Sequence, residues 1–139
     1  MAKEHKTTSR HLLELWGDNA VHHPLDNVAA SYVNHQMPDA SGGTSDKSLD
    51  EWKALLADFH QGFSDVTMEV MQQVAEGDLV CSRFRMKAKH TGLFEQHAAT
   101  GKTTSWTGVQ TDRYKDNQLV ESWVDWDKFS FLEGLGLVA

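Results

Sequence analysis

The feature that most constrains the fold is the alternation of apolar and polar residues that begins at Asp65 and continues through most of the second half of the chain. Residues 79–90, 102–114 and 118–126 each show a period of two, which predicts three long strands after a first strand that starts at Asp65. Turns are expected at residues 76–78 and 115–117. Because aromatic and polar residues share these strands, the sheet is expected to line a pocket as well as a core.

The first half of the chain has helical spacing. A helix capped by Thr8 or Ser9 is expected first, and a short second helix is expected to begin near Pro24. The apolar residues of this second helix would share one face: Leu25, Val28, Ala29 and Tyr32. A third helix begins at the capping box Ser48-Leu49-Asp50-Glu51.

The remaining segments are assigned from turn and cap signals. Residues 1–7 are expected to form a disordered tail, residues 32–37 to be extended, and residues 38–47 to form a loop. Asp127 is expected to cap a last short helix over residues 128–135. Helices followed by consecutive antiparallel strands give the α+β class, with a curved sheet wrapped around three N-terminal helices.

Length and charge exclude several classes of function. A chain of 139 residues is expected to be a single domain, and its net charge of −7 fits poorly with nucleic acid or an anionic membrane surface. Cys81 is the one cysteine, so no internal disulfide is possible. Since no apolar run is long enough to span a bilayer and the N-terminus lacks a signal core, a cytoplasmic location is expected.

Short motifs spread over residues 10–136 resemble one known family in a single register. They are Tyr32-Val33-Asn34-His35, Gly77-Asp78-Leu79-Val80, Arg83-Phe84, His90-Thr91-Gly92, Gly108, Arg113, Leu119-Val120-Glu121-Ser122-Trp123, Asp127 and Leu135-Gly136. This combination resembles the SnoaL-like proteins, also called polyketide-cyclase-like or ester-cyclase proteins, of the nuclear transport factor 2-like superfamily.

The resemblance implies a cone-shaped α+β barrel that is often a homodimer through the outer face of its sheet. SnoaL-type cyclases close a ring of a polyketide by intramolecular aldol addition, without metal or organic cofactor. They use an aspartate on the last strand as acid and base, with a histidine on the preceding strand. Here the histidine position falls on Gln110. The aspartate position falls on Val124 without a gap, or on Asp125 after a shift of one residue, which the Asp125-Trp126 pair favours.

Asp125 is therefore the candidate base, because a carboxylate in an apolar pocket has a raised pKa and can remove a proton next to a carbonyl. The alternative is a solvated or dimer-facing strand residue. His35 is the second catalytic candidate, and its alternative is a hydrogen bond to a loop. Asp127 is a candidate for the pocket or a helix cap.

The other candidates for substrate contact each have a structural alternative. Gln110 can polarise a carbonyl or bond within the sheet, and His90 can serve the pocket or its own loop. Arg83 can reach a ligand carboxylate or pair with Glu69 or Asp125. Trp106 and Trp126 are expected to supply apolar walls.

Eight histidines do not show the spacing of a metal site, and no phosphate-binding glycine loop is present, so neither metal nor nucleotide is expected. The first hypothesis is a cofactor-free cyclase or isomerase acting on a small hydrophobic carbonyl compound. The alternatives are a non-catalytic binding module and a dimeric interaction protein of the same fold.

Overall fold

A computed structural model describes residues 2–20, 25–36 and 45–138. The helices are α1 (Ala2–Glu14), α2 (Leu49–Gly62) and α3 (Lys128–Gly134), with a short 3-10 turn at Asp18–Ala20. The strands are β1 (Val28–Gln36), β2 (Ser45–Ser48), β3 (Phe63–Glu76), β4 (Leu79–His90), β5 (Thr103–Lys115) and β6 (Gln118–Trp126). The described part of the chain is thus α+β with three α-helices, of which two precede the long strands and one follows them.

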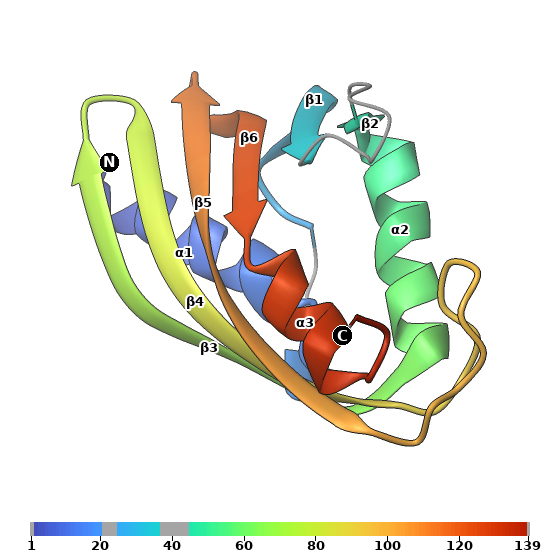
Figure 1. Ribbon diagram of the computed structural model, residues 1–139. Helices are drawn as coiled ribbons and strands as arrows, with labels where there is room; N and C mark the ends of the chain where they lie inside the picture. The colour runs from blue at the N-terminus through green and yellow to red at the C-terminus, as the bar shows by residue number, and fades with distance from the viewer. Residues whose placement is uncertain (1, 21–24, 37–44, 139) are drawn as a thin grey trace.

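The six strands form one curved sheet in the order β2-β1-β6-β5-β4-β3. Only β1 and β6 run parallel, and the other neighbouring strands are antiparallel. In Figure 1, β3, β4 and β5 sweep in long arcs toward the foot of α2, so the sheet is concave and unclosed. Register shifts in β3 near Asp65 and Met71 mark bulges, which bend a strand.

The helices pack on the concave face. Phe131 of α3 lies in an aromatic core with Phe59 of α2 and Trp106 of β5. A second core gathers around Trp52, Tyr114 and other buried apolar residues between α1, α2 and the opposite end of the sheet. Alternate residues of β4 and β5 point inward and are buried, while their neighbours are exposed. This alternation decides which side chains can line an interior space.

Several predictions of local structure are confirmed. The bounds of β4 and β6 agree with the expected strands, and α2 begins at a capping box in which Ser48 and Glu51 bond each other's backbone N–H groups. Asp127 caps α3 by accepting from the backbone N–H of Ser130 at 3.0 Å. These signals are local, so they are visible in the sequence.

The predicted second helix is wrong. From Val28 the chain forms β1, which pairs in parallel with β6, a strand about ninety residues further along the chain. Spacing alone allowed a helix, but the pairing with β6 and the burial of Tyr32 and Asn34 require a strand with period two. Pro24 lies outside the described residues.

The expected disordered tail is also wrong from Ala2 onward, because α1 begins there. His5 is buried and stacks on Tyr114 at a ring distance of 4.1 Å, which fixes this end of the chain. The loop predicted over residues 38–47 lies partly outside the described residues, and Ser45–Lys47 belong to β2. None of the described helices is long and apolar enough to cross a membrane.

Gly108 provides a test of the inner packing. A Cβ atom there would lie 2.5 Å from Phe84 Cζ and 2.8 Å from Trp126 Cβ. We therefore expect Gly108→Ala to lower the free energy of unfolding by roughly 1–3 kcal/mol, the usual cost of overpacking, as measured by denaturant titration. The control is Thr107→Ala on the exposed face of the same strand, expected within about 0.5 kcal/mol. Equal effects of the two substitutions would contradict this packing.

Candidate functional site

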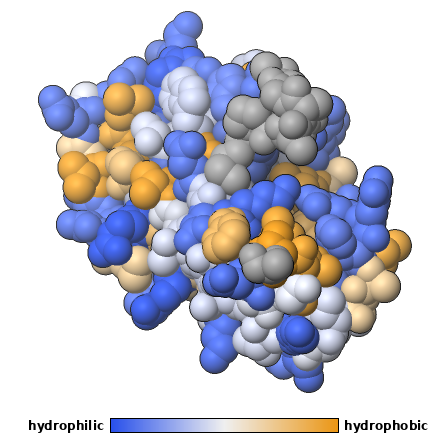
Figure 2. Space-filling view, in the orientation of Figure 1, coloured by the Kyte–Doolittle hydropathy of each residue, from blue (hydrophilic) through white to orange (hydrophobic). Residues whose placement is uncertain are grey.

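A cavity of about 270 Å³ lies inside the cone. Its wall is mostly aromatic or otherwise apolar and comes from all three helices and the sheet. The apolar lining residues are Leu13, Trp16, Leu55, Phe59, Met68, Phe84, Met86, Phe94, Trp106, Val124, Trp126 and Phe131. The polar and charged ones are Gln36, Ser45, Lys47, Glu95, Gln110 and Lys128. Figure 2 shows hydrophobic side chains gathered over and beside α3.

The aromatic wall is held in place by ring contacts. Phe131 lies edge-on to Trp106 at 4.8 Å and to Trp126 at 5.3 Å. Phe59 packs edge-on to Trp16 at 5.3 Å. Rings fixed in this way form a preformed apolar site, which suits a flat ligand.

Gln110 is the buried polar residue of the inner wall. Its Nε2 donates to Asp112 Oδ1 at 3.0 Å, and Ser122 Oγ donates to the same oxygen at 2.5 Å. Asp112 is fully buried and does not line the cavity. It therefore lies behind Gln110 and positions that amide.

The charge of Asp112 is unfavourable in this place. Burial raises the pKa of the carboxyl, and hydrogen bonds from Ser122 and Gln110 offset part of the rise. Within the described part of the chain, Asp112 Oδ2 has no hydrogen-bond partner. Burial also raises the pKa of Tyr32, so this hydroxyl stays neutral.

Buried polar side chains form a row that continues from Asp112 to Gln36, a second amide that lines the cavity. Ser122 also hydrogen-bonds Tyr32, whose hydroxyl accepts from Asn34 Nδ2 at 2.8 Å. Asn34 Oδ1 in turn accepts a hydrogen bond from Nε2 of Gln36, which lines the cavity. A buried chain of polar groups thus joins Gln36 to Gln110 behind the wall.

The structure places Asp125 on the outer face of β6. It pairs with Val109 and is exposed, whereas Val124 pairs with Gln110 and lines the cavity. Val124, the residue at the family's aspartate position when no gap is allowed, is therefore the one whose side chain points inward. The prediction that Asp125 is a base inside the cone is wrong. Strand alternation is the reason, since a shift of one residue moves a side chain to the other face.

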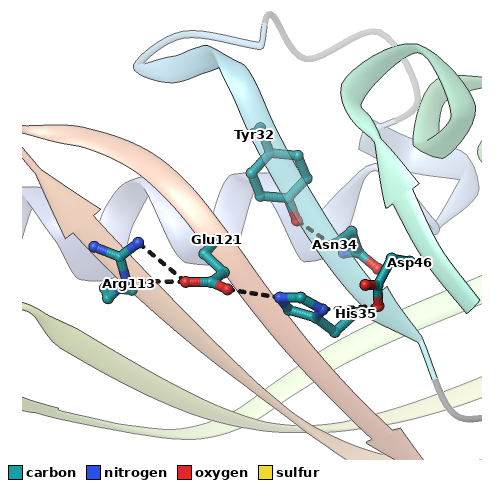
Figure 3. A network of polar contacts seen from close by, with 6 residues as sticks. All are labelled: Tyr32, Asn34, His35, Asp46, Arg113 and Glu121. Carbon is teal, nitrogen blue, oxygen red and sulfur yellow. Dashed lines mark hydrogen bonds and ion pairs between the residues drawn. The ribbon is translucent and has the colours of Figure 1, made fainter. Parts of the chain in front are cut away.

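His35 lies on the same outer face and belongs to a row of charged groups drawn in Figure 3. Its Nδ1 lies 2.8 Å from Asp46 and its Nε2 2.6 Å from Glu121, which Arg113 contacts at 3.0 Å. The ring stacks on Trp123 at 5.4 Å. His35 does not line the cavity, so the structure does not bring it together with Gln110.

Three other candidates also lie away from the cavity. His90 is buried at the end of β4, where Nδ1 accepts from the backbone N–H of Thr100 at 3.2 Å, and burial lowers its pKa. Arg83 is exposed on the outer face, and Glu69 pairs with Arg85 at 2.9 Å instead. Asp127 is an exposed helix cap.

Trp106, Trp126 and Gln110 are the predicted site residues that the cavity does bring together. Sequence reasoning missed Asp112 and Gln36. The signal for Asp112 was its place two residues after Gln110, on the same face of an alternating strand. No group of three or more His, Cys, Asp or Glu among the described residues is placed to hold a metal ion.

The comparisons with known proteins agree with the fold. The model of the SnoaL-like polyketide cyclase family matches residues 6–135, so the chain belongs to this family. None of the curated proteins matches it. AclR of Streptomyces galilaeus, described as a candidate hydroxylase, is 23% identical with a TM-score of 0.83, and 100% of each chain is covered.

Two further structures have the same fold. IdmH of Streptomyces antibioticus, described as a candidate polyketide cyclase, is 25% identical with a TM-score of 0.77, over 94% of this chain and 97% of its own. A SnoaL-like candidate cyclase of Jannaschia is 14% identical with a TM-score of 0.81, over 99% of this chain and 95% of its own. These likenesses show the fold, and the match to the family model is what supports small-molecule binding of the cyclase or isomerase kind.

The outer network predicts a pH dependence of stability. Partial burial lowers the pKa of His35, but hydrogen bonds and charges of Glu121 and Asp46 outweigh it, so the pKa is raised. A raised folded-state pKa gives stability that is present below the usual value near 6.5 and lost as pH rises through the folded value. We therefore expect the free energy of unfolding of the wild type to be higher than that of His35→Gln by up to about 1 kcal/mol at pH 5.5. At pH 9 the difference is expected to be smaller. Denaturant titrations at the two pH values measure it.

The control is Asp125→Asn on the same face, expected to change the free energy of unfolding by no more than about 0.5 kcal/mol at either pH. A difference between wild type and His35→Gln that is equal at both pH values would contradict the network.

Proposed function

We propose that the protein binds a small, flat, largely apolar carbonyl compound in the cone cavity and promotes its cyclisation or isomerisation without a cofactor. The observation that carries the proposal is an aromatic cavity whose inner wall holds a rigidly positioned amide, Gln110. The cavity volume of about 270 Å³ is near the lower end of the range for ligand pockets, which suits a compound of one ring or two fused rings.

The proposed contribution to the reaction is orientation. The resemblance implies an aspartate acid and base, but Val124 lines the wall at that position and Asp112 lies behind Gln110. The chain's own residues can hold the two reacting ends of a flexible compound together between Trp106 and Trp126. They can also hydrogen-bond an enol or carbonyl at Gln110. Holding reacting groups in place lowers the entropic part of a barrier.

A ligand-binding module without turnover is the second candidate, and the apolar side chain of Val124 favours it. One assay distinguishes the cyclase or isomerase from the binding module. A 1,5-diketone that closes to a cyclohexenone is followed by absorbance with and without the protein. Faster closure supports the cyclase, whereas a diketone that binds without faster closure supports the module.

Binding in the cavity is tested by tryptophan fluorescence, because Trp16, Trp106 and Trp126 line it. With 2-naphthol as probe, we expect saturable binding that Val124→Phe weakens by roughly tenfold or more, since the larger side chain fills the space. Val74→Phe is the matched control. It lies at the exposed end of β3 and is expected to bind as wild type does. Failure of the probe to bind, or an equal effect of both variants, would overturn the proposal.

We also propose a homodimer formed through the outer face of the sheet, in a protein located in the cytoplasm. Val109 pairs with Asp125, and Trp123 lies two residues before Asp125 on the same face of β6, so the two side chains, each 37% exposed, are diagonal neighbours. Trp123 also stacks on His35, which Figure 3 draws. The location rests on the sequence alone. Partial exposure of two large apolar side chains favours burial against a second copy.

Light scattering tests the dimer. We expect twice the chain mass of 15.6 kDa for wild type and for Val74→Lys, and a shift toward the single-chain mass for Val109→Lys. The reason is that a lysine at position 109 would have to be desolvated in the interface, and this is costly even beside Asp125, with which position 109 pairs. A wild-type mass of one chain at high micromolar concentration would rule out this assembly.

A further inference from the structure

The orientation of the Gln110 amide indicates which ligand group it can hold. Its Nε2 donates to Asp112 Oδ1 at 3.0 Å. A turned amide would place its own oxygen against that carboxyl oxygen, which already accepts from Ser122 at 2.5 Å. Two acceptors at this distance repel each other, and a buried polar group without a hydrogen-bond partner is costly. The amide is therefore fixed with its nitrogen on the buried side.

The carbonyl oxygen of the Gln110 amide, Oε1, is the atom that can bind a ligand in the cavity. Gln110 is part of the cavity wall and Asp112 is not, so the bond to Asp112 uses one of the two N–H groups and holds the nitrogen toward the buried side. The carbonyl oxygen on the other side of the amide is then available to a ligand. The strand geometry keeps this arrangement, because Gln110 pairs with Val124 and Asp112 pairs with Ser122 on the inner face of β5 and β6.

Gln36 repeats the pattern at the other end of the buried chain. Its Nε2 donates to Asn34 Oδ1, and Asn34 Nδ2 is itself committed to the Tyr32 hydroxyl at 2.8 Å. Gln36 also lines the cavity. Two amides on separate strands thus each commit an N–H group to the buried polar side chains behind the cavity wall. The ammonium groups on its lining belong to Lys47 and Lys128, which come from edge strand β2 and the start of α3.

We propose that the inner wall selects ligands by their hydrogen-bond donors, namely phenolic or enolic hydroxyl groups, and that Asp112 is the positioning residue that imposes this choice. The inference rests on the proposed function and narrows it. A carbonyl compound would be held at Gln110 as its enol, whose hydroxyl can donate to Oε1, rather than as its keto form, which offers only an acceptor.

The selectivity of binding tests this inference. The probes are 2-naphthol, which has a donor, and 2-methoxynaphthalene, which has only an acceptor. The measured quantity is the Kd of 2-methoxynaphthalene divided by that of 2-naphthol. We expect a ratio of about ten in wild type, because one hydrogen bond to a buried acceptor is worth about 1.4 kcal/mol here. In Gln110→Leu, which keeps the size and removes the acceptor, the ratio is expected to fall toward one.

Asp112→Asn tests the positioning role. The asparagine amide offers both a donor and an acceptor, so Gln110 can turn and the ratio is expected to fall several-fold. Loss of stability alone would not change a ratio of two affinities. A wild-type ratio near one, or an unchanged ratio in Gln110→Leu, would overturn the donor selectivity. An unchanged ratio in Asp112→Asn would overturn the role of Asp112. If neither probe binds, the proposed function itself fails.

Discussion

The hydrogen bonds to Asp112 are the interaction on which the interior of this protein depends. They lie between the aromatic core around Phe131 and the second core around Trp52. A carboxyl without a charged partner is costly to bury, so it requires the surrounding donors Ser122 and Gln110. Because these groups have to remain bonded to one another, apolar side chains do not fill the space beside them. The row of polar groups runs behind the cavity wall and reaches the cavity at Gln110 and Gln36.

The same row links strand pairing to the site. β1 and β6 pair in parallel, which brings Asn34 to Ser122 in register. Without that pairing, Tyr32 and Gln36 would have no connection to β5. The alternation of β5 then separates two environments on one strand, with Trp106, Gln110 and Asp112 inside and Val109 outside. The inner face binds small molecules in our account, and the outer face carries the charged network and the proposed dimer contact.

The sequence predicts what depends on near neighbours. The ends of β4 and β6, the cap at Ser48 and the cap at Asp127 follow from residues a few positions apart. The strand β1 could not be predicted in this way, because its helical spacing is overridden by pairing with a distant strand. For the site, Trp106, Trp126 and Gln110 follow from alternation, but a choice between Val124 and Asp125 depends on the exact register. Asp112 is recognised only when the burial of its carboxyl is seen.

Membership of the SnoaL-like family limits the chemistry without fixing it. The similar structures are described as a candidate hydroxylase in one case and a candidate polyketide cyclase in another, so one fold is associated with different reactions. In this chain Gln110 and Val124 are paired neighbours on β5 and β6, and both side chains point inward. An amide opposite an apolar side chain favours holding and orienting a ligand over transferring its protons.

A crystal structure of the protein with bound 2-naphthol tests the central claim most directly. Our account predicts density for the rings between Trp106 and Trp126, with the hydroxyl at hydrogen-bond distance, about 2.7–2.8 Å, from Gln110 Oε1. Density for the compound on the outer face, beside His35 or Asp125, or inside the cone with its hydroxyl turned away from Gln110, would contradict it.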